Sequence, residues 1–140
     1  MRSIHEARAM PYLQLDVPDR YPIDVKRNLA RRLGEIYSRL LQTSPDMVTV
    51  AFREMDEGGV WRCSDGEPEP AAQLMCDIRS GRPPGQRAEL AQALIEACTE
   101  SLGLSSDHLG VEFTQHTGDE MYRAERGFAA NWTPAKGRMP

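Results

Sequence analysis

The sequence predicts an α+β fold in which two tandem β-α-β units form a four-stranded mixed sheet with two helices on one face. Three observations predict it: an internal repeat, the same strand–helix–strand order in each copy, and the length of the chain. The 140 residues suit one domain with a modest core. Hydrophobic residues make up 40% and charged residues 27%, which is ordinary for a globular protein.

The repeat becomes visible when the sequence is slid along itself until Leu13 lies over Leu74. This alignment needs no gap and has far more identities than unrelated segments of this length share. A fixed offset between similar segments indicates a repeated structural unit. Further identical pairs are Asp16/Asp77, Pro22/Pro83, Leu29/Leu90, Leu33/Leu94, Leu41/Leu102, Val50/Val111, Phe52/Phe113, Arg62/Arg123 and Gly66/Gly127.

The first copy reads as strand, helix and strand. Tyr12–Val17 alternates apolar and polar residues, which is typical of a strand with one buried face. Pro22 and Asp24 then open a helix, since proline and an acidic residue both favour a first helical turn. Met47–Glu54 is the second predicted strand. The apolar positions of the helix are Val25, Leu29, Leu33, Ile36 and Leu40.

The second copy repeats this order. Gln73–Ile78 and Leu109–Thr114 are its predicted strands, and Pro83 precedes its helix. Gly103 is expected to end that helix as a left-handed cap. Because a β-α-β crossover makes its two strands parallel, each copy contributes one parallel pair to the sheet. The apolar positions of the second helix are Leu90, Leu94, Ala97 and Cys98.

The chain is predicted to be one domain with short flanking segments. Two helices on one face leave the other face of the sheet uncovered, so a homo-oligomer is expected. Trp61, Phe128 and Trp132 are expected to pack on a neighbouring subunit. The predicted segments are an N-terminal extension 1–10, a first unit 11–66, a linker 67–71, a second unit 72–127 and a C-terminal tail 128–140.

Composition excludes several classes of function. The net charge of −4 offers no basic stripe for nucleic acid. No apolar run approaches the roughly 18 residues of a membrane span, so no membrane partner is expected. The three cysteines are an odd number at wide spacing, which predicts reduced thiols and a cytoplasmic protein. His108 and His116 are isolated in the sequence, so no metal site is predicted.

A family resemblance rests on two short motifs placed on this repeat. Met10-Pro11 opens the first strand, and Arg79-Ser80-Gly81-Arg82 leads into the second helix. From about Met10 to Gly127 the chain resembles the tautomerase superfamily, which includes 4-oxalocrotonate tautomerase, cis-3-chloroacrylic acid dehalogenase and malonate semialdehyde decarboxylase. The fused length and the arginine pair are most similar to the dehalogenase group. The resemblance implies a homotrimer and chemistry without a cofactor.

The resemblance also implies roles for three residues. Pro11 falls where the family has an N-terminal catalytic proline, which acts as a general base or a general acid. An α-amino group ordinarily titrates near pH 7.7–8, and desolvation lowers that value toward working pH. Arg79 and Arg82 fall where the dehalogenase binds the substrate carboxylate, which a guanidinium grips at two points. Ala72 occupies the proline position of the second copy, so one proline site is expected per subunit.

Three further candidate residues depart from the dehalogenase pattern. Tyr37 stands where the dehalogenase has a histidine, Glu112 where it has a tyrosine, and Arg123 where it has a water-activating glutamate. Without that glutamate, hydrolytic dehalogenation is disfavoured relative to tautomerisation or decarboxylation. Tyr37 can equally be read as a wall or core residue, and Arg123 as a partner in a structural ion pair.

Because the function of Pro11 depends on where the chain starts, more than one hypothesis about the activity stays open. If the chain starts at Met1, the proline nitrogen is an amide; if it starts at Met10, removal of that methionine exposes a secondary amine. The first hypothesis is cofactor-independent proton transfer on a small 2-oxo or enol carboxylate. The alternative is a non-catalytic carboxylate-binding or assembly protein whose proline is blocked. A lyase of the decarboxylase or dehalogenase type is a further alternative, and the sequence does not identify the substrate.

Overall fold

The computed structural model describes residues 11–125, 127–130 and 133. The predicted extension 1–10, Trp132 and residues 134–140 of the predicted tail lie outside the described residues. The elements are β1 Tyr12–Val17, α1 Ile23–Leu41, η2 Pro45–Met47, β2 Thr49–Glu54, β3 Trp61–Arg62, β4 Glu69–Pro70, β5 Ala72–Arg79, α2 Pro84–Leu102, η3 Ser106–His108, β6 Leu109–His116, η4 Gly118–Glu120, β7 Tyr122–Arg123 and β8 Gly127–Phe128.

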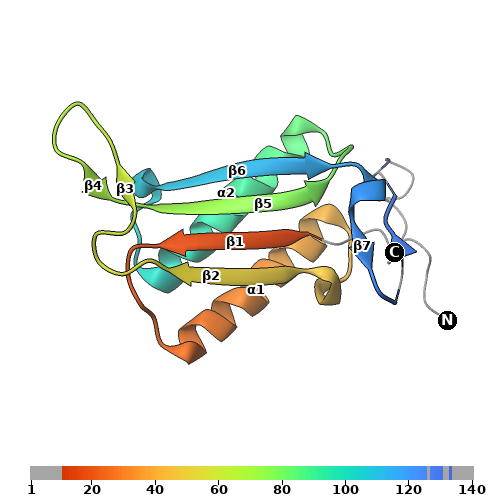
Figure 1. The fold of residues 1–140 in the computed structure, drawn as a ribbon, viewed down its shortest axis with the longest axis horizontal. Coiled ribbons are helices and arrows are strands. Elements are labelled where there is room, and N and C mark those ends of the chain that lie inside the picture. Colours follow the sequence, from red (N-terminus) through yellow and green to blue (C-terminus); the bar gives the residue numbers. More distant parts are fainter. Residues whose placement is uncertain (1–10, 126, 131–132, 134–140) are drawn as a thin grey trace.

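The main sheet confirms the predicted fold class. Its strand order is β2-β1-β5-β6 (Figure 1). β1 pairs with β2 in parallel and β5 pairs with β6 in parallel, while β1 and β5 are antiparallel neighbours. Each parallel pair is the product of one β-α-β crossover, and the antiparallel contact joins the two copies into one mixed sheet.

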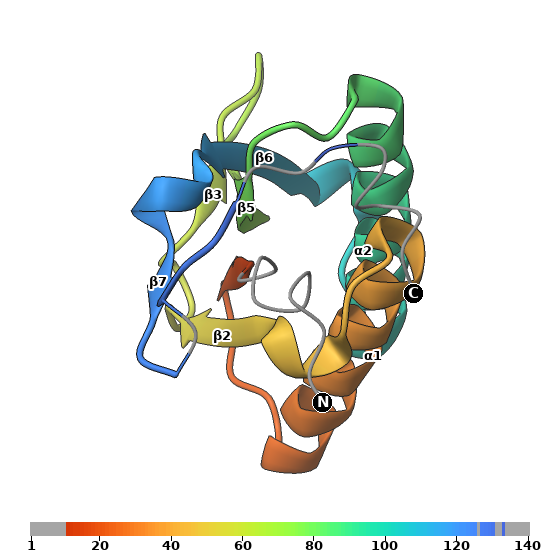
Figure 2. The same ribbon diagram turned by 90° about the vertical axis from the view of Figure 1, so that its right-hand side faces the viewer.

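Both helices cover the same face of the sheet, as predicted (Figure 2). Each helix turns an apolar stripe toward the strands, and Leu33 of α1 and Leu94 of α2 are fully buried there. The inward residues of β1 and β5, such as Leu15 and Leu74, complete this core. Gly103 follows α2 with φ 69° and donates its backbone N–H to Thr99, which is the predicted left-handed cap.

The face of the sheet away from the helices is mostly polar. Gln14 and Asp16 of β1 and Asp77 of β5 are half-buried, while Thr114 of β6 is exposed. Because side chains alternate along a strand, these residues occupy the positions between the core residues. No other part of the described chain forms a second layer over this face (Figures 1 and 2).

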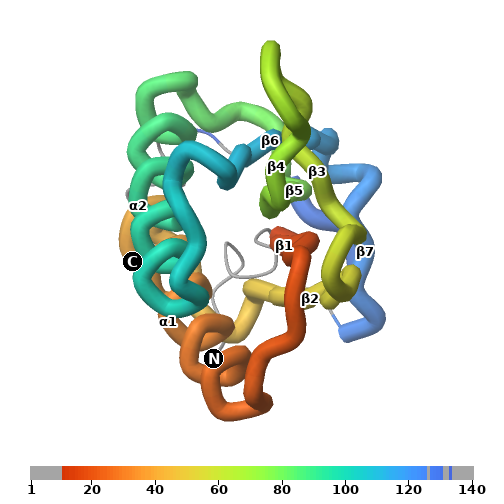
Figure 3. Tube along the Cα trace, turned by 90° about the vertical axis from the view of Figure 1, so that its left-hand side faces the viewer, coloured from red at the N-terminus to blue at the C-terminus, as the bar shows by residue number. Residues whose placement is uncertain are grey.

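Two short hairpins lie at opposite ends of the sheet. β3 pairs with β4 at one end, and β7 pairs with β8 at the other (Figure 1). Figure 3 looks onto the end that carries β3 and β4. Tyr122 and Phe128 form an edge-to-face aromatic pair between β7 and β8, with ring centroids 5.0 Å apart. β4 lies inside the predicted linker 67–71, so that segment contains a paired strand.

The three cysteines differ in accessibility, which gives a direct check of the core. Cys63 is exposed, whereas Cys76 and Cys98 are buried, and burial raises the pKa of each buried thiol to about 12. A thiolate is the reactive form of cysteine. We therefore expect one fast-reacting thiol per native chain with Ellman's reagent and three after denaturation. Rapid reaction of all three in the native protein would contradict this core.

Candidate active site

Several strand ends meet at the end of the sheet where Pro11 precedes β1. β1 starts there, and the antiparallel strand β5 finishes there, so Tyr12 pairs with Asp77. β6 finishes at the same level, with His116 opposite Arg79. The backbone N–H of Thr49, at the start of β2, donates to the Pro11 carbonyl at 3.2 Å. The topology thus gathers residues from four strands around Pro11.

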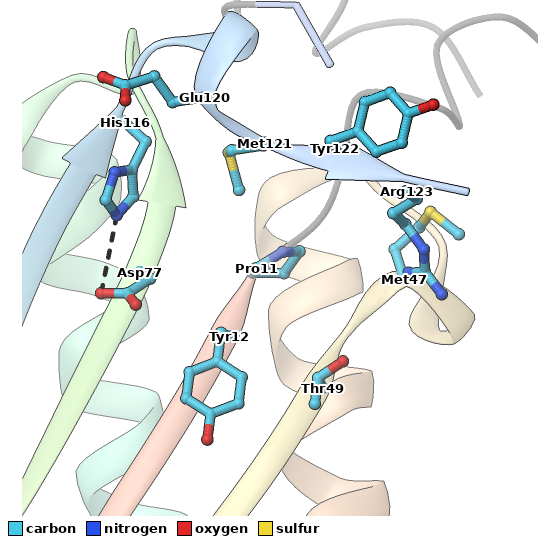
Figure 4. A pocket seen from close by; sticks show the side chains of 10 residues that line it. All are labelled: Pro11, Tyr12, Met47, Thr49, Asp77, His116, Glu120, Met121, Tyr122 and Arg123. Carbon is cyan, nitrogen blue, oxygen red and sulfur yellow. Dashed lines mark ion pairs between the residues drawn. The ribbon is translucent and has the colours of Figure 1, made fainter. Parts of the chain in front are cut away.

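A hollow of about 380 Å³ opens at this end (Figure 4). Pro11, itself buried, lies at the base of β1 in its wall. One part of the wall is apolar and another carries ionisable side chains, which suits a small ligand with both characters. The other lining residues are Tyr12, Met47, Thr49, Asp77, His116, Glu120, Met121, Tyr122 and Arg123.

Arg123 brings a positive charge to the hollow from β7. Its Nε lies 3.4 Å from Glu125 Oε1, and its side chain is one-third exposed. The repeat partner Arg62 instead donates from Nη1 to the Asp107 carbonyl at 3.2 Å. Arg123 therefore both lines the hollow and forms an ion pair with Glu125.

His116 and Asp77 were not predicted as site residues, yet both line the hollow beside Pro11. His116 Nε2 lies 4.0 Å from Asp77 Oδ1, a distance that forms an ion pair when the imidazole is protonated. The signal that places them is the sheet register, because His116 ends a strand that is parallel to β5. The sequence around His116 alone does not show that this histidine lies near Asp77.

The two predicted carboxylate-binding arginines lie at the same end of the sheet but are buried. Arg79 is 5% exposed and Arg82 is 3% exposed. Arg79 ends β5 and donates from Nη1 to the Ala130 carbonyl at 3.2 Å. Gly81 has φ 119°, a conformation that glycine adopts easily, and it turns the chain between the two arginines toward the start of α2.

Tyr37 of α1 joins these arginines in one buried cluster. Desolvation raises the pKa of the Tyr37 phenol, and the charges of Arg82 and Arg79 oppose that rise. Burial lowers the pKa of Arg82 to about 10, while Tyr37 raises it and Arg79 lowers it further. Arg82 therefore stays charged at neutral pH. Tyr37, Arg79 and Arg82 therefore lie close enough for their charges to influence one another.

Four predicted site residues are not part of the lining of the hollow: Tyr37, Arg79 and Arg82, which form the buried cluster, and Glu112. Glu112 is exposed in the middle of β6, opposite Met75 of β5. His116 at the hollow is four positions further along β6, a span of roughly 13 Å. Among the residues that the structure describes, no three His, Cys, Asp or Glu side chains converge as metal ligands. Within the same residues, no helix is long and apolar enough to cross a membrane.

Solved structures of other proteins share the fold of this chain. N1, a member of the cis-3-chloroacrylic acid dehalogenase (cis-CaaD) family, superposes with a TM-score of 0.76 at 18% identity and covers 92% of both chains. The tautomerase fold is the fold of this chain. The fused 4-OT Q0, solved as a wild-type symmetric trimer, gives a TM-score of 0.73 at 22% identity, covering 85% of this chain and 95% of its own.

A third protein of the tautomerase fold was solved after chemical inactivation. Pt0534, inactivated by 2-oxo-3-pentynoate, gives a TM-score of 0.72 at 22% identity and covers 85% of this chain and 95% of its own. A scan against protein-family models finds no match, and neither does a search of the curated proteins. These structures confirm the predicted resemblance at the level of the fold. Their identities to this chain are 18% to 22%, which show a shared fold alone.

Proposed function

We propose that this protein catalyses cofactor-independent proton transfer on a small 2-oxo or enol carboxylate, in the form of the chain that begins at Pro11. The observation that carries the proposal is that Pro11, in the wall of a hollow of about 380 Å³, lies at the same end of the sheet as two buried arginines. The inactivation of Pt0534 by 2-oxo-3-pentynoate, itself a small 2-oxo acid, supports this substrate class.

Pro11 supplies the proton-transfer group in this proposal. As the first residue, it carries a secondary amine with a lone pair that accepts a proton near neutral pH. Its burial at the base of β1 desolvates the charged ammonium form, which favours the neutral base. Inside the chain, the same nitrogen is bonded to the Met10 carbonyl and has no lone pair available for a proton.

The buried arginines supply the carboxylate-binding group. Arg79 and Arg82 repel each other in a region shielded from solvent, and a bound carboxylate relieves that repulsion. Guanidinium groups bind a carboxylate with two parallel hydrogen bonds and polarise a neighbouring carbonyl. Arg123, which lines the hollow, adds a positive charge to those of the two buried arginines. These charges stabilise the enolate that forms when a proton leaves the carbon next to a 2-oxo group.

Arg123 also bears on the choice between reactions. A guanidinium remains protonated at neutral pH and cannot remove a proton from water. Proton transfer on the substrate is therefore favoured over hydrolytic dehalogenation. Decarboxylation of a 3-oxo acid stays the alternative, and carbon dioxide release separates it from tautomerisation.

A second candidate function applies to the chain that begins at Met1. There the Met10–Pro11 amide blocks the proline, and the protein is a carboxylate-binding or assembly member without proline chemistry. Both forms of the chain contain Arg79 and Arg82. Binding of a 2-oxo acid without proton transfer at Pro11 is the result that favours this candidate.

Arg82→Ala tests the carboxylate site in either form. We expect the dissociation constant for phenylpyruvate, measured by calorimetry, to rise at least about tenfold, because a charge-assisted bidentate contact is lost. Arg82→Lys should recover only part of the affinity, since an ammonium lacks the planar fork. Arg31→Ala, at an exposed position of α1, is the matched control. Equal affinities in a folded Arg82→Ala protein would contradict this carboxylate site.

The uncovered polar face of the sheet and the trimer of the fused 4-OT Q0 support a homotrimer for this chain. Light scattering should give three times the chain mass of 15.7 kDa. A subunit contact over the middle of this face would bury Asp16 and Glu112 and leave the hollow at the end of the sheet open. A monomer at micromolar concentration would contradict the proposed assembly.

A further inference from the structure

The hollow contains a second group suited to moving a proton, besides Pro11. We propose that His116, positioned by Asp77, exchanges the substrate proton in the chain whose Pro11 is acylated by Met10. This inference rests on the proposed function, because it takes the same 2-oxo carboxylate in the same hollow. It gives the form of the chain that begins at Met1 a base of its own.

Pairing with β5 and a hydrogen bond from the following turn fix the backbone of His116. His116 is the last residue of β6 and lies opposite Arg79 in the register with β5. Its carbonyl accepts a hydrogen bond from the Ser80 N–H at 2.6 Å. This bond ties the end of β6 to the turn that carries the arginine pair. The backbone of His116 is therefore fixed relative to Arg79.

The imidazole lies in the wall of the hollow and turns toward Asp77 (Figure 4). Asp77 belongs to the neighbouring strand β5, and its Oδ1 lies 4.0 Å from His116 Nε2. This separation is longer than a hydrogen bond, so Asp77 acts on His116 through its charge. With Nε2 directed at the carboxylate, Nδ1 is the ring nitrogen left to exchange a proton with a ligand.

The side chains of His116 and Asp77 are accessible from the hollow. Its side chain is 36% exposed and that of Asp77 is 42% exposed, so neither is sealed from a ligand that enters the hollow. The other titratable or charged groups that line the hollow are Tyr12 of β1, Glu120 at the end of η4, Tyr122 of β7 and Arg123 of β7.

The chemical step conserves atoms and electrons without any further reactant. Neutral Nδ1 removes a proton from C3 of the 2-oxo carboxylate, and the C–H electron pair becomes the C2=C3 bond of an enolate. The electron pair of the C2=O π bond moves to that oxygen, where Arg79 and Arg82 offset the negative charge. The imidazolium then returns its proton to the enolate oxygen, or to C3 in the reverse direction. Asp77 stabilises the transient imidazolium.

The experiment uses the intact 140-residue chain, with its mass verified, and phenylpyruvate as the probe. The exchange of the C3 protons into deuterium oxide is followed by NMR for the parent chain and for His116→Asn. We expect the exchange rate to fall at least about tenfold in His116→Asn, within the range that a general base contributes. His108→Asn is the matched control, because His108 also pairs with a carboxylate, Glu69, at 2.7 Å, outside the hollow.

The outcomes separate this inference from the proposed function. Parent-like exchange in His116→Asn overturns the inference. An intact chain without exchange, beside an active chain that begins at Pro11, also overturns it and leaves the proposed function standing. Absence of exchange in both chains overturns both proposals. If His116→Asn melts below the assay temperature, His116→Gln takes its place.

Asp77→Asn and Asp77→Glu test the positioning role together. Asp77→Asn removes the carboxylate that faces His116, so we expect the exchange rate to fall, whereas Asp77→Glu keeps the carboxylate and should recover part of the rate. A purely structural role for Asp77 would give the same loss in both variants. A parent-like rate in folded Asp77→Asn would remove Asp77 from the inference.

Discussion

Removal of residues 1–10, so that the chain begins at Pro11, is expected to raise the rate of phenylpyruvate ketonisation at least about 100-fold over the 140-residue chain. The change converts a tertiary amide into a secondary amine at the wall of the hollow. General acid–base catalysis by a positioned group contributes about 10²–10⁴-fold. The loss of the enol absorbance of phenylpyruvate measures the rate for both chains.

Pro11→Ala in the shortened chain separates the secondary amine from the mere removal of the extension. The alanine variant keeps an N-terminal amine but loses the ring that fixes its direction, and we expect kcat/KM to fall at least about tenfold. A shortened chain that is no faster than the full chain would contradict a catalytic role for Pro11. Equal rates for the shortened chain and its Pro11→Ala variant would show that the ring is irrelevant.

Truncation of the matched core leucines is expected to have the largest effect on stability. Leu33 and Leu94 are repeat partners on α1 and α2, and both are fully buried. Replacement of either by alanine removes buried apolar surface and leaves a cavity, which costs about 2–5 kcal/mol. Urea unfolding at one fixed protein concentration measures the change, since unfolding of an oligomer depends on concentration.

Ile23→Ala is the control for both variants, because Ile23 begins α1 and is 65% exposed. We expect it to change the free energy of unfolding by less than about 0.5 kcal/mol, as for ordinary surface substitutions. Similar losses for Leu33→Ala and Leu94→Ala would support one core shared by the two copies. A loss confined to one of them would mean that the halves are packed unequally.

The repeat made the architecture predictable from the sequence. Once Leu13 lies over Leu74, one β-α-β reading serves for both halves, and the crossover rule gives the parallel pairs. The cap at Gly103 was predictable because glycine after a periodic apolar run adopts the left-handed conformation. The predicted strand over 47–54 begins instead at Thr49, because Pro45–Met47 form a short 3-10 turn.

Contacts between segments far apart in the sequence could not be predicted from local patterns. His116 and Asp77 are 39 positions apart (116 − 77), and they come together because β5 and β6 are paired in register. The short hairpins have two-residue strands, too brief for any periodicity to reveal. The site residues inferred from the resemblance to the dehalogenase group do not all lie together. Pro11 and Arg123 line the hollow, whereas Glu112 lies on the open face of the sheet.

The most direct test of the central claim is to incubate the chain that begins at Pro11 with 2-oxo-3-pentynoate and locate the adduct by mass spectrometry. An alkyne conjugated to a carbonyl adds to a nucleophilic amine, so a free Pro11 nitrogen in the wall of the hollow should be labelled. Cys63→Ser removes the one exposed thiol as a competing nucleophile. We predict one adduct per chain on the peptide that begins at Pro11, and much slower labelling in Arg82→Ala. An unmodified Pro11 peptide after prolonged incubation would contradict the account.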